Sequence, residues 1–161
     1  MKQLDDILRQ NAAFKTLLNG KGNIIVNDIN DEALLISSAF LILKKNIVVV
    51  KPNQYEANRL YQQVMSINER DALLFPVDES YRIEALAASP ELLGQRIDTL
   101  YQLTTNKPKI LITHSQALVR YLPTKQIFKE NCLDLKVGMQ IDIYDLQKYL
   151  IKAGYQSAIR V

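Results

Sequence analysis

The chain has 161 residues, of which 48% are apolar, and a formal net charge of +3. This length suits one ordinary domain, or one domain and part of another. One cysteine and one histidine exclude a disulfide framework and a zinc site made of Cys and His side chains alone. Acidic residues near the N-terminus argue against a signal sequence, and no apolar run has the length of a membrane span. We therefore expect a cytoplasmic protein with no membrane partner.

The positive charge is concentrated near the C-terminus. Basic and acidic residues balance from Met1 to Leu118, so the whole excess lies between Val119 and Val161. Such a bias favours an acidic protein surface or a nucleic-acid backbone as partner, although an ordinary solvated surface is the commoner explanation.

The N-terminal part of the sequence predicts a helix, a strand and a second helix. Apolar residues follow a helical period from Leu4 to Leu18, and Asn19-Gly20 is a usual helix end. Asn23–Val26 has the pattern of a buried strand. The helix from about Glu32 to Lys44 is apolar on most sides, which predicts burial between layers.

The turn between that strand and helix, Asn27-Asp28-Ile29-Asn30-Asp31, occupies the place of the phosphate-binding loop in many nucleotide-binding α/β domains. Such a loop needs glycines, which let backbone N–H groups approach the phosphates, and a Lys-Ser/Thr pair. The turn contains neither, and Glu32 adds a third acid to its two aspartates. These carboxylates suit the positive end of the helix dipole but would repel a triphosphate. The sequence therefore predicts that no nucleotide binds here.

Three further apolar strands alternate with helices. Their ranges are Asn46–Val50, Ala72–Pro76 and Lys109–Thr113. Capping patterns mark the helix starts, with Asn53 capping one helix, Ser89 a second and Ser115 the short helix Gln116–Tyr121. This alternation predicts an α/β fold with a mostly parallel sheet and helices on both faces.

The pattern changes after Leu122, and we predict one domain over residues 1–122 and a partial small α+β domain over residues 123–161. Cys132–Val137 predicts a strand, and a helix capped near Asp142 runs to Gly154. Gln156–Val161 predicts a further strand. A strand-helix-strand piece of this size buries little surface, which is typical of a small domain continued elsewhere in a longer protein.

Three side chains are expected at the carboxyl edge of the sheet, where parallel α/β domains bind ligands. His114 is the best single candidate for an acid or base, but no serine, cysteine or acid is tied to it by a recognisable spacing. We interpret it as a polar strand-end residue. Asp78 and Glu79 are candidates for a magnesium site, but without a phosphate loop a solvated acidic loop is the better interpretation. We predict neither a catalytic residue nor a metal site.

Two arginines and the cysteine receive structural interpretations. Arg82 and Arg96 have no phosphate site to serve, so we interpret both as surface or salt-bridging residues. Cys132 lies within a strand pattern and is interpreted as a core residue rather than a nucleophile.

Several segments, in this order along the chain, resemble the N-terminal region of bacterial transcription-repair coupling factor. They are Asn23–Leu43, NIVVVKPN, FPVDESYRIEALAASPELLGQRIDTLYQL and ILITHSQALVRYLP. The most specific piece is Ala88-Ser89-Pro90-Glu91 followed by Gln95-Arg96. DLQKYLIKAGYQ near the C-terminus is similar to the second domain of that family, so the resemblance covers essentially the whole chain.

The same region of that family is similar to UvrB, the damage-verifying subunit of nucleotide excision repair. The resemblance implies a helicase-like domain, called 1A, whose phosphate loop has degenerated at Asn27–Asp31. It also implies a small domain 2 that binds the UvrA subunit. Of the family's UvrA-contacting arginines only Arg160 has a counterpart here, and Gln156 stands where family members often have a basic residue.

The resemblance also bears on cofactors and partners. The ATP-driven motor of that family, with its magnesium, and its contacts with RNA polymerase and DNA belong to downstream domains. We therefore expect no cofactor and no enzymatic activity in this chain. Two alternatives stay open: a nucleotide-dependent enzyme with an unusual phosphate site near Asp78, Glu79 and His114, and a nucleic-acid-binding module that uses the basic C-terminal quarter.

Overall fold

The computed structural model of the chain describes residues 10–20, 22–77, 89–119 and 121–156. They divide into two compact units, Met1–Lys129 and Glu130–Val161. The predicted division after Leu122 remains a prediction about folding units. No helix in the described residues is long and apolar enough to cross a membrane.

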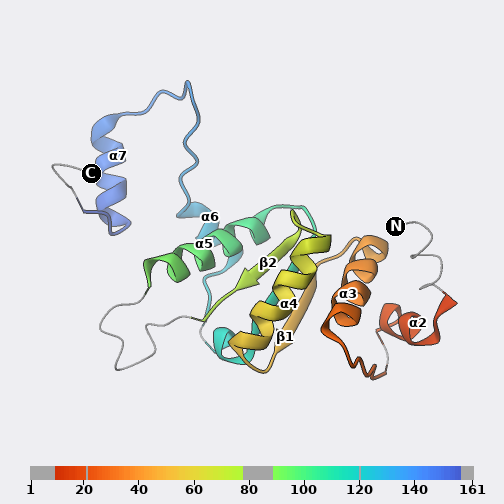
Figure 1. Cartoon of the computed structure of the whole chain (residues 1–161). Helices are drawn as coiled ribbons and strands as arrows, with labels where there is room; N and C mark the ends of the chain where they lie inside the picture. Colours follow the sequence, from red (N-terminus) through yellow and green to blue (C-terminus); the bar gives the residue numbers. More distant parts are fainter. Residues whose placement is uncertain (1–9, 21, 78–88, 120, 157–161) are drawn as a thin grey trace. The chain divides into compact units, whose positions relative to one another are not determined.

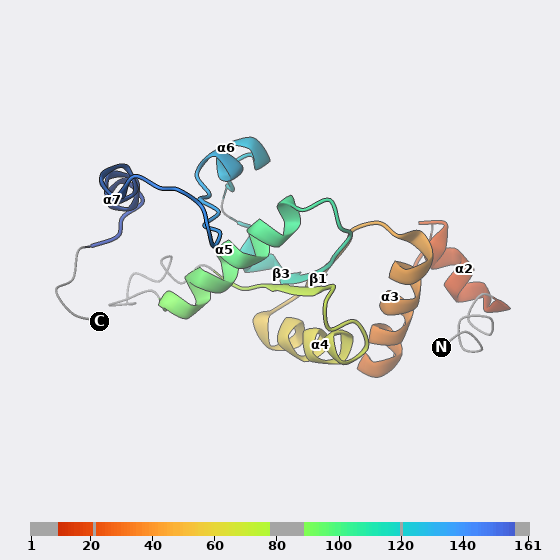
Figure 2. The same ribbon diagram turned by 90° about the horizontal axis from the view of Figure 1, so that it is seen from above.

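The first unit contains a three-stranded, entirely parallel sheet in the order β1-β3-β2. The strands are β1 (Ile47–Lys51), β2 (Ala72–Phe75) and β3 (Ile110–His114). α4 (Gln54–Ile67) packs against all three strands. Figure 2 shows α4 on one face of the sheet and α5 (Pro90–Thr104) on the other. The predicted α/β fold with a parallel sheet is therefore confirmed.

The core lies between α4, the sheet and α3 (Ile29–Leu43), which packs on α4 (Figure 1). Apolar residues of α4 recur three to four positions apart and so share one helix face. The buried cluster consists of Ala33, Phe40, Ala57, Leu60, Val64, Ala72, Ile110 and Ile112. The β-branched residues of β1 and β3 fit the pleated surface beneath this helix.

Two of the four predicted caps form their hydrogen bonds to the helix backbone, and two do not. The backbone N–H of Glu56 donates to Asn53 Oδ1 over 2.9 Å, and Asp142 accepts from the first turn of α7 (Ile143–Lys152). Ser89 occupies the N-cap position of α5 with Pro90 after it, as predicted, but its side chain makes no capping bond to the backbone, and its hydroxyl donates to Glu91. The Ser115 hydroxyl donates to the Pro52 carbonyl instead of capping a helix.

Three predicted N-terminal and central elements are corrected. Of the helix predicted from Leu4 to Leu18, residues 4–9 lie outside the described residues. The described part breaks at Asn11, whose side chain accepts from two backbone N–H groups and starts α2 (Ala12–Leu18). Asn23–Val26 is extended but pairs with no strand in the described chain. The predicted helix Gln116–Tyr121 is a single 3-10 turn, η2 (Ser115–Leu118).

The second unit contains α7 and irregular segments in its described residues, and the short α6 (Lys125–Glu130) crosses the division between the units. The strand predicted at Cys132–Val137 is wrong, since this segment has no strand partner and turns at Gly138, where φ is 86°. An apolar stretch without a neighbouring strand cannot form a ladder. Tyr149 anchors α7 by donating to the Asn131 carbonyl over 2.6 Å. The strand predicted at Gln156–Val161 lies almost wholly outside the described residues.

Candidate functional site

The second half of the turn Asn27–Asp31 is the start of a helix. Asp28 is the N-cap of α3, and its carboxylate accepts from the Asn30 N–H over 2.6 Å. Asp31 and Glu32 lie in the first turn. The backbone donors and the positive end of the helix dipole are therefore directed at carboxylates of the chain itself, which occupy the position favoured by a bound anion.

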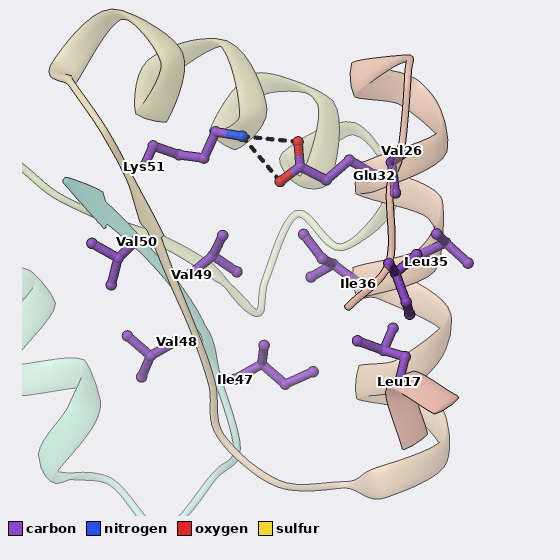
Figure 3. Close-up of a pocket in the computed structure, with 11 residues that line it drawn as sticks. Leu17, Val26, Glu32, Leu35, Ile36, Ile47, Val48, Val49, Val50 and Lys51 are labelled. Carbon is purple, nitrogen blue, oxygen red and sulfur yellow. Dashed lines mark hydrogen bonds and ion pairs between the residues drawn. The ribbon is translucent and has the colours of Figure 1, made fainter. Parts of the chain in front are cut away.

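Glu32 is joined to the end of β1 by an ion pair. Both of its carboxylate oxygens accept from Lys51 Nζ, over 3.1 and 3.0 Å (Figure 3). The pair is mostly shielded, with 19% of the Lys51 side chain and 27% of the Glu32 side chain exposed. The lysine at this edge is therefore paired with a carboxylate, and the turn Asn27–Asp31, where a phosphate loop would have its lysine, contains none.

The ion pair closes one end of a cavity of about 510 Å³ between β1, α3 and the extended segment 23–26. Figure 3 shows Ile47 and Val49 directed toward α3 across this cavity, while Val48 and Val50 point the opposite way. Apart from Glu32 and Lys51, every lining residue is apolar. The cavity thus offers apolar contact and no free cation for a phosphate group.

His114 ends β3, at the carboxyl edge of the sheet, with Lys51 as its register partner. It is 1% exposed, and neither ring nitrogen has a hydrogen-bond partner. Desolvation by burial lowers its pKa from the usual 6.5. Within the described residues no nucleophile or acid is hydrogen-bonded to it, and no group of three or more His, Cys, Asp or Glu side chains is able to hold a metal.

The burial of His114 predicts a pH dependence of stability. The pKa of His114 is lower in the folded state than in the unfolded state. Its contribution to the free energy of unfolding is therefore fully present above about pH 6.5 and is lost as the pH falls below that value. His114 is the chain's one histidine, so the variant His114→Gln is expected to lose this dependence. The measurement is Tm by circular dichroism between about pH 5.5 and 7.5. An unchanged slope of Tm against pH in His114→Gln would contradict the assignment.

The other predicted residues are not joined to this ion pair, and four of them lie outside the described residues. Asp78, Glu79, Arg82 and Arg160 lie outside the described residues. Arg96 is not a surface residue: it is 6% exposed, its guanidinium donates to the Pro76 carbonyl over 2.6 Å, and it lies 4.1 Å from the centre of the Phe75 ring. Cys132 is half-buried in an irregular segment rather than in a strand core.

Sequence reasoning missed Lys51 and the role of Glu32. Lys51 is the polar residue directly after a hydrophobic run. Its distance from Glu32 along the sequence does not indicate that the two side chains are in contact. A signal existed in the topology, because the carboxyl end of a parallel strand and the N-terminus of the preceding crossover helix lie on the same edge of the sheet.

Comparisons with known proteins find relatives that are transcription-repair-coupling factors. The chain is 28% identical over 97% of its length to the transcription-repair-coupling factor of Bacillus subtilis and 25% identical over 95% to that of Staphylococcus haemolyticus. It is 31% identical over 70% of its length to the transcription-repair-coupling factor of Rickettsia bellii.

The chain spans 14% of the length of the first two relatives and 10% of the third. No family model matches, and no solved structure matches significantly. The chain is a homologue of part of the bacterial transcription-repair coupling factors, consistent with their N-terminal region.

Proposed function

We propose that this chain is a non-catalytic, UvrB-like adaptor module of a transcription-repair coupling factor, which recruits UvrA to lesions where RNA polymerase has stalled. In this proposal the module contributes binding, and the ATP-driven motor with its magnesium belongs to other parts of the whole protein. Contacts with RNA polymerase and DNA that drive coupling are likewise assigned to those parts.

The observation that carries the non-catalytic part is the Glu32–Lys51 ion pair at the N-terminus of α3. A bound triphosphate would require Lys51 to exchange its carboxylate for a phosphate, and it would place several negative charges beside Asp28, Asp31 and Glu32. Removing one partner of a shielded pair leaves an uncompensated charge, which costs free energy. The geometry therefore disfavours nucleotide at the edge where related folds bind it.

The adaptor part rests on the resemblance of DLQKYLIKAGYQ to a UvrA-binding domain. This segment forms α7 and the turn after it, with Gly154 at φ 93°. Most of α7 is exposed in the described unit, which leaves its side chains available to a partner.

The test pairs a nucleotide titration with a binding measurement. A nucleotide that bound would stabilise the fold by about 2.7 kcal/mol at 100 times its Kd, so ATP with magnesium is expected to leave Tm unchanged. UvrA binding is measured by biolayer interferometry with the chain extended through the rest of domain 2. We expect binding, weakened about 10-fold or more in Arg160→Glu, because reversing an interface charge costs both attraction and desolvation.

The matched control is Lys15→Glu, which makes the same change in charge at an exposed position of α2, outside the DLQKYLIKAGYQ segment. It is expected to alter UvrA affinity much less than Arg160→Glu. Absence of UvrA binding by the extended chain would overturn the adaptor proposal. A rise in Tm with ATP would instead revive a nucleotide-dependent enzyme and direct attention back to His114 and the loop that contains Asp78 and Glu79.

A further inference from the structure

A second cavity, of about 480 Å³, lies at the amino edge of the sheet, opposite the edge discussed above. It is formed where the chain passes from α3 into β1 and from α5 into β3, together with the start of α6. Its lining residues are Lys44, Lys45, Asn46, Leu103, Thr105, Asn106, Lys107, Pro108 and Lys125. We call its four lysines, Lys44, Lys45, Lys107 and Lys125, the lysine pocket. No carboxylate lines it.

The lysine pocket differs from its buried neighbour, Lys109. The ammonium of Lys109 is 3.2 Å from Asp71 and donates to the Arg70 carbonyl over 2.5 Å, and its side chain is 8% exposed. All four pocket lysines are exposed, and none forms an ion pair within the part of the chain that the structure describes. Four positive charges therefore share one cavity without internal neutralisation.

Helix stabilisation does not account for this cluster. Lysines near a helix C-terminus interact favourably with the dipole, but the effect is confined to the last turn. The last turns of α3 and α5 contain no basic residue. Lys107 and Lys125 lie beyond both helices, so their charges need another explanation.

The backbone of Lys44 adds a second observation. Lys44 has φ 49° and ψ 41°, the left-handed conformation, and it is the one non-glycine residue with positive φ in the described chain. A lysine there costs about 1–2 kcal/mol relative to the right-handed conformation, which a glycine would avoid. Strained positions of this kind cluster at functional sites, and here the strain retains a charged side chain in the pocket.

A fixed amide supplements the charges. Asn46 Oδ1 accepts from the Lys109 backbone N–H over 2.9 Å, which leaves the amide NH2 group of Asn46 as a donor. The pocket therefore combines ammonium groups with a neutral donor held in one orientation by the strand start.

We propose that the lysine pocket binds the sugar-phosphate backbone of nucleic acid. The pocket lies at the C-terminal ends of α3 and α5, so it lacks the converging backbone N–H groups with which a helix N-terminus favours a small anion. Lysines on long flexible stems instead suit a chain of separate phosphates, each met by one ammonium. The site is independent of the UvrA proposal and of the basic C-terminal quarter, since three of its four lysines lie before Val119.

The test is fluorescence anisotropy of a labelled DNA duplex with the 161-residue chain across a range of salt concentrations. If all four lysines meet phosphates, the slope of log K against log[salt] is about −3 to −4. Replacing the four pocket lysines by alanine is expected to weaken binding at least about 10-fold at low salt and to bring the slope near zero. The four Lys→Arg changes keep the charge and are expected to retain binding.

The matched control removes four exposed lysines outside the pocket: Lys15, Lys129, Lys136 and Lys152. It makes the same change in net charge and should keep most of the affinity. Equal losses in the two alanine variants, or no binding by the parent chain, would overturn the site. Full competition by inorganic phosphate would identify a small-anion site, and full competition by polyglutamate an acidic protein partner; either result also overturns the proposal. Unchanged circular dichroism shows that the variants are folded.

Discussion

Leu60→Ala is expected to destabilise the first unit by about 2–5 kcal/mol. Leu60 is fully buried on α4, the helix that contacts every strand of the sheet. Its removal loses apolar burial and leaves a cavity that α3 and the sheet fill only in part. Since small domains have a total stability of about 5–15 kcal/mol, this change removes a large share of it.

The measurement is urea unfolding followed by far-ultraviolet circular dichroism. Asn58→Ala on the exposed face of the same helix is the matched control, with an expected change within about 0.5 kcal/mol. Similar midpoints for the two variants would mean that α4 does not form the core as described.

Arg96→Ala is expected to cost about 2–4 kcal/mol, although arginine is usually a surface residue. The guanidinium lies over the Phe75 ring and donates to the Pro76 carbonyl in a buried setting. Alanine would leave that carbonyl unsatisfied and remove the ring contact.

Arg59→Ala provides the comparison, because Arg59 also lies over an aromatic ring, that of Tyr55 at 5.7 Å, but both residues are exposed. Exposed pairs of this kind contribute about 0.5–1 kcal/mol. Unfolding midpoints of both variants give the test, and a loss at Arg96 no larger than at Arg59 would refute the structural role.

The sequence was informative where local signals agreed with each other. The β-branched run before Lys51, the Asn53 cap and the apolar face of α4 all predict one strand-helix unit, and the structure contains it. Asn11 shows the limit, because an apolar period continues through it while its side chain starts a new helix. A periodicity describes which residues are buried but not where a polar side chain competes for the backbone.

Strand predictions failed where pairing decides the outcome. Asn23–Val26 and Cys132–Val137 have strand-like composition, but a strand exists through its neighbour, and composition does not identify the neighbour. For the same reason, composition does not reveal the Glu32–Lys51 ion pair or the lysine pocket. Glu32 meets Lys51, and Lys44 shares a cavity with Lys107, only because parallel crossovers bring separate connections to one sheet edge.

The two borders of the sheet differ chemically. The Leu74 carbonyl of β2 accepts from Thr99 over 2.8 Å, and the Pro76 carbonyl, directly after the strand, accepts from Arg96; both donors lie on α5. In the described residues neither outer border has a strand neighbour, but that of β2 has these two contacts from α5. Unpaired backbone N–H and C=O groups at a sheet edge can pair with a further strand, so the two edges of this sheet differ in how readily they accept one. We therefore expect a strand that joins the sheet, from a longer chain or from a second molecule, to add beside β1 rather than beside β2.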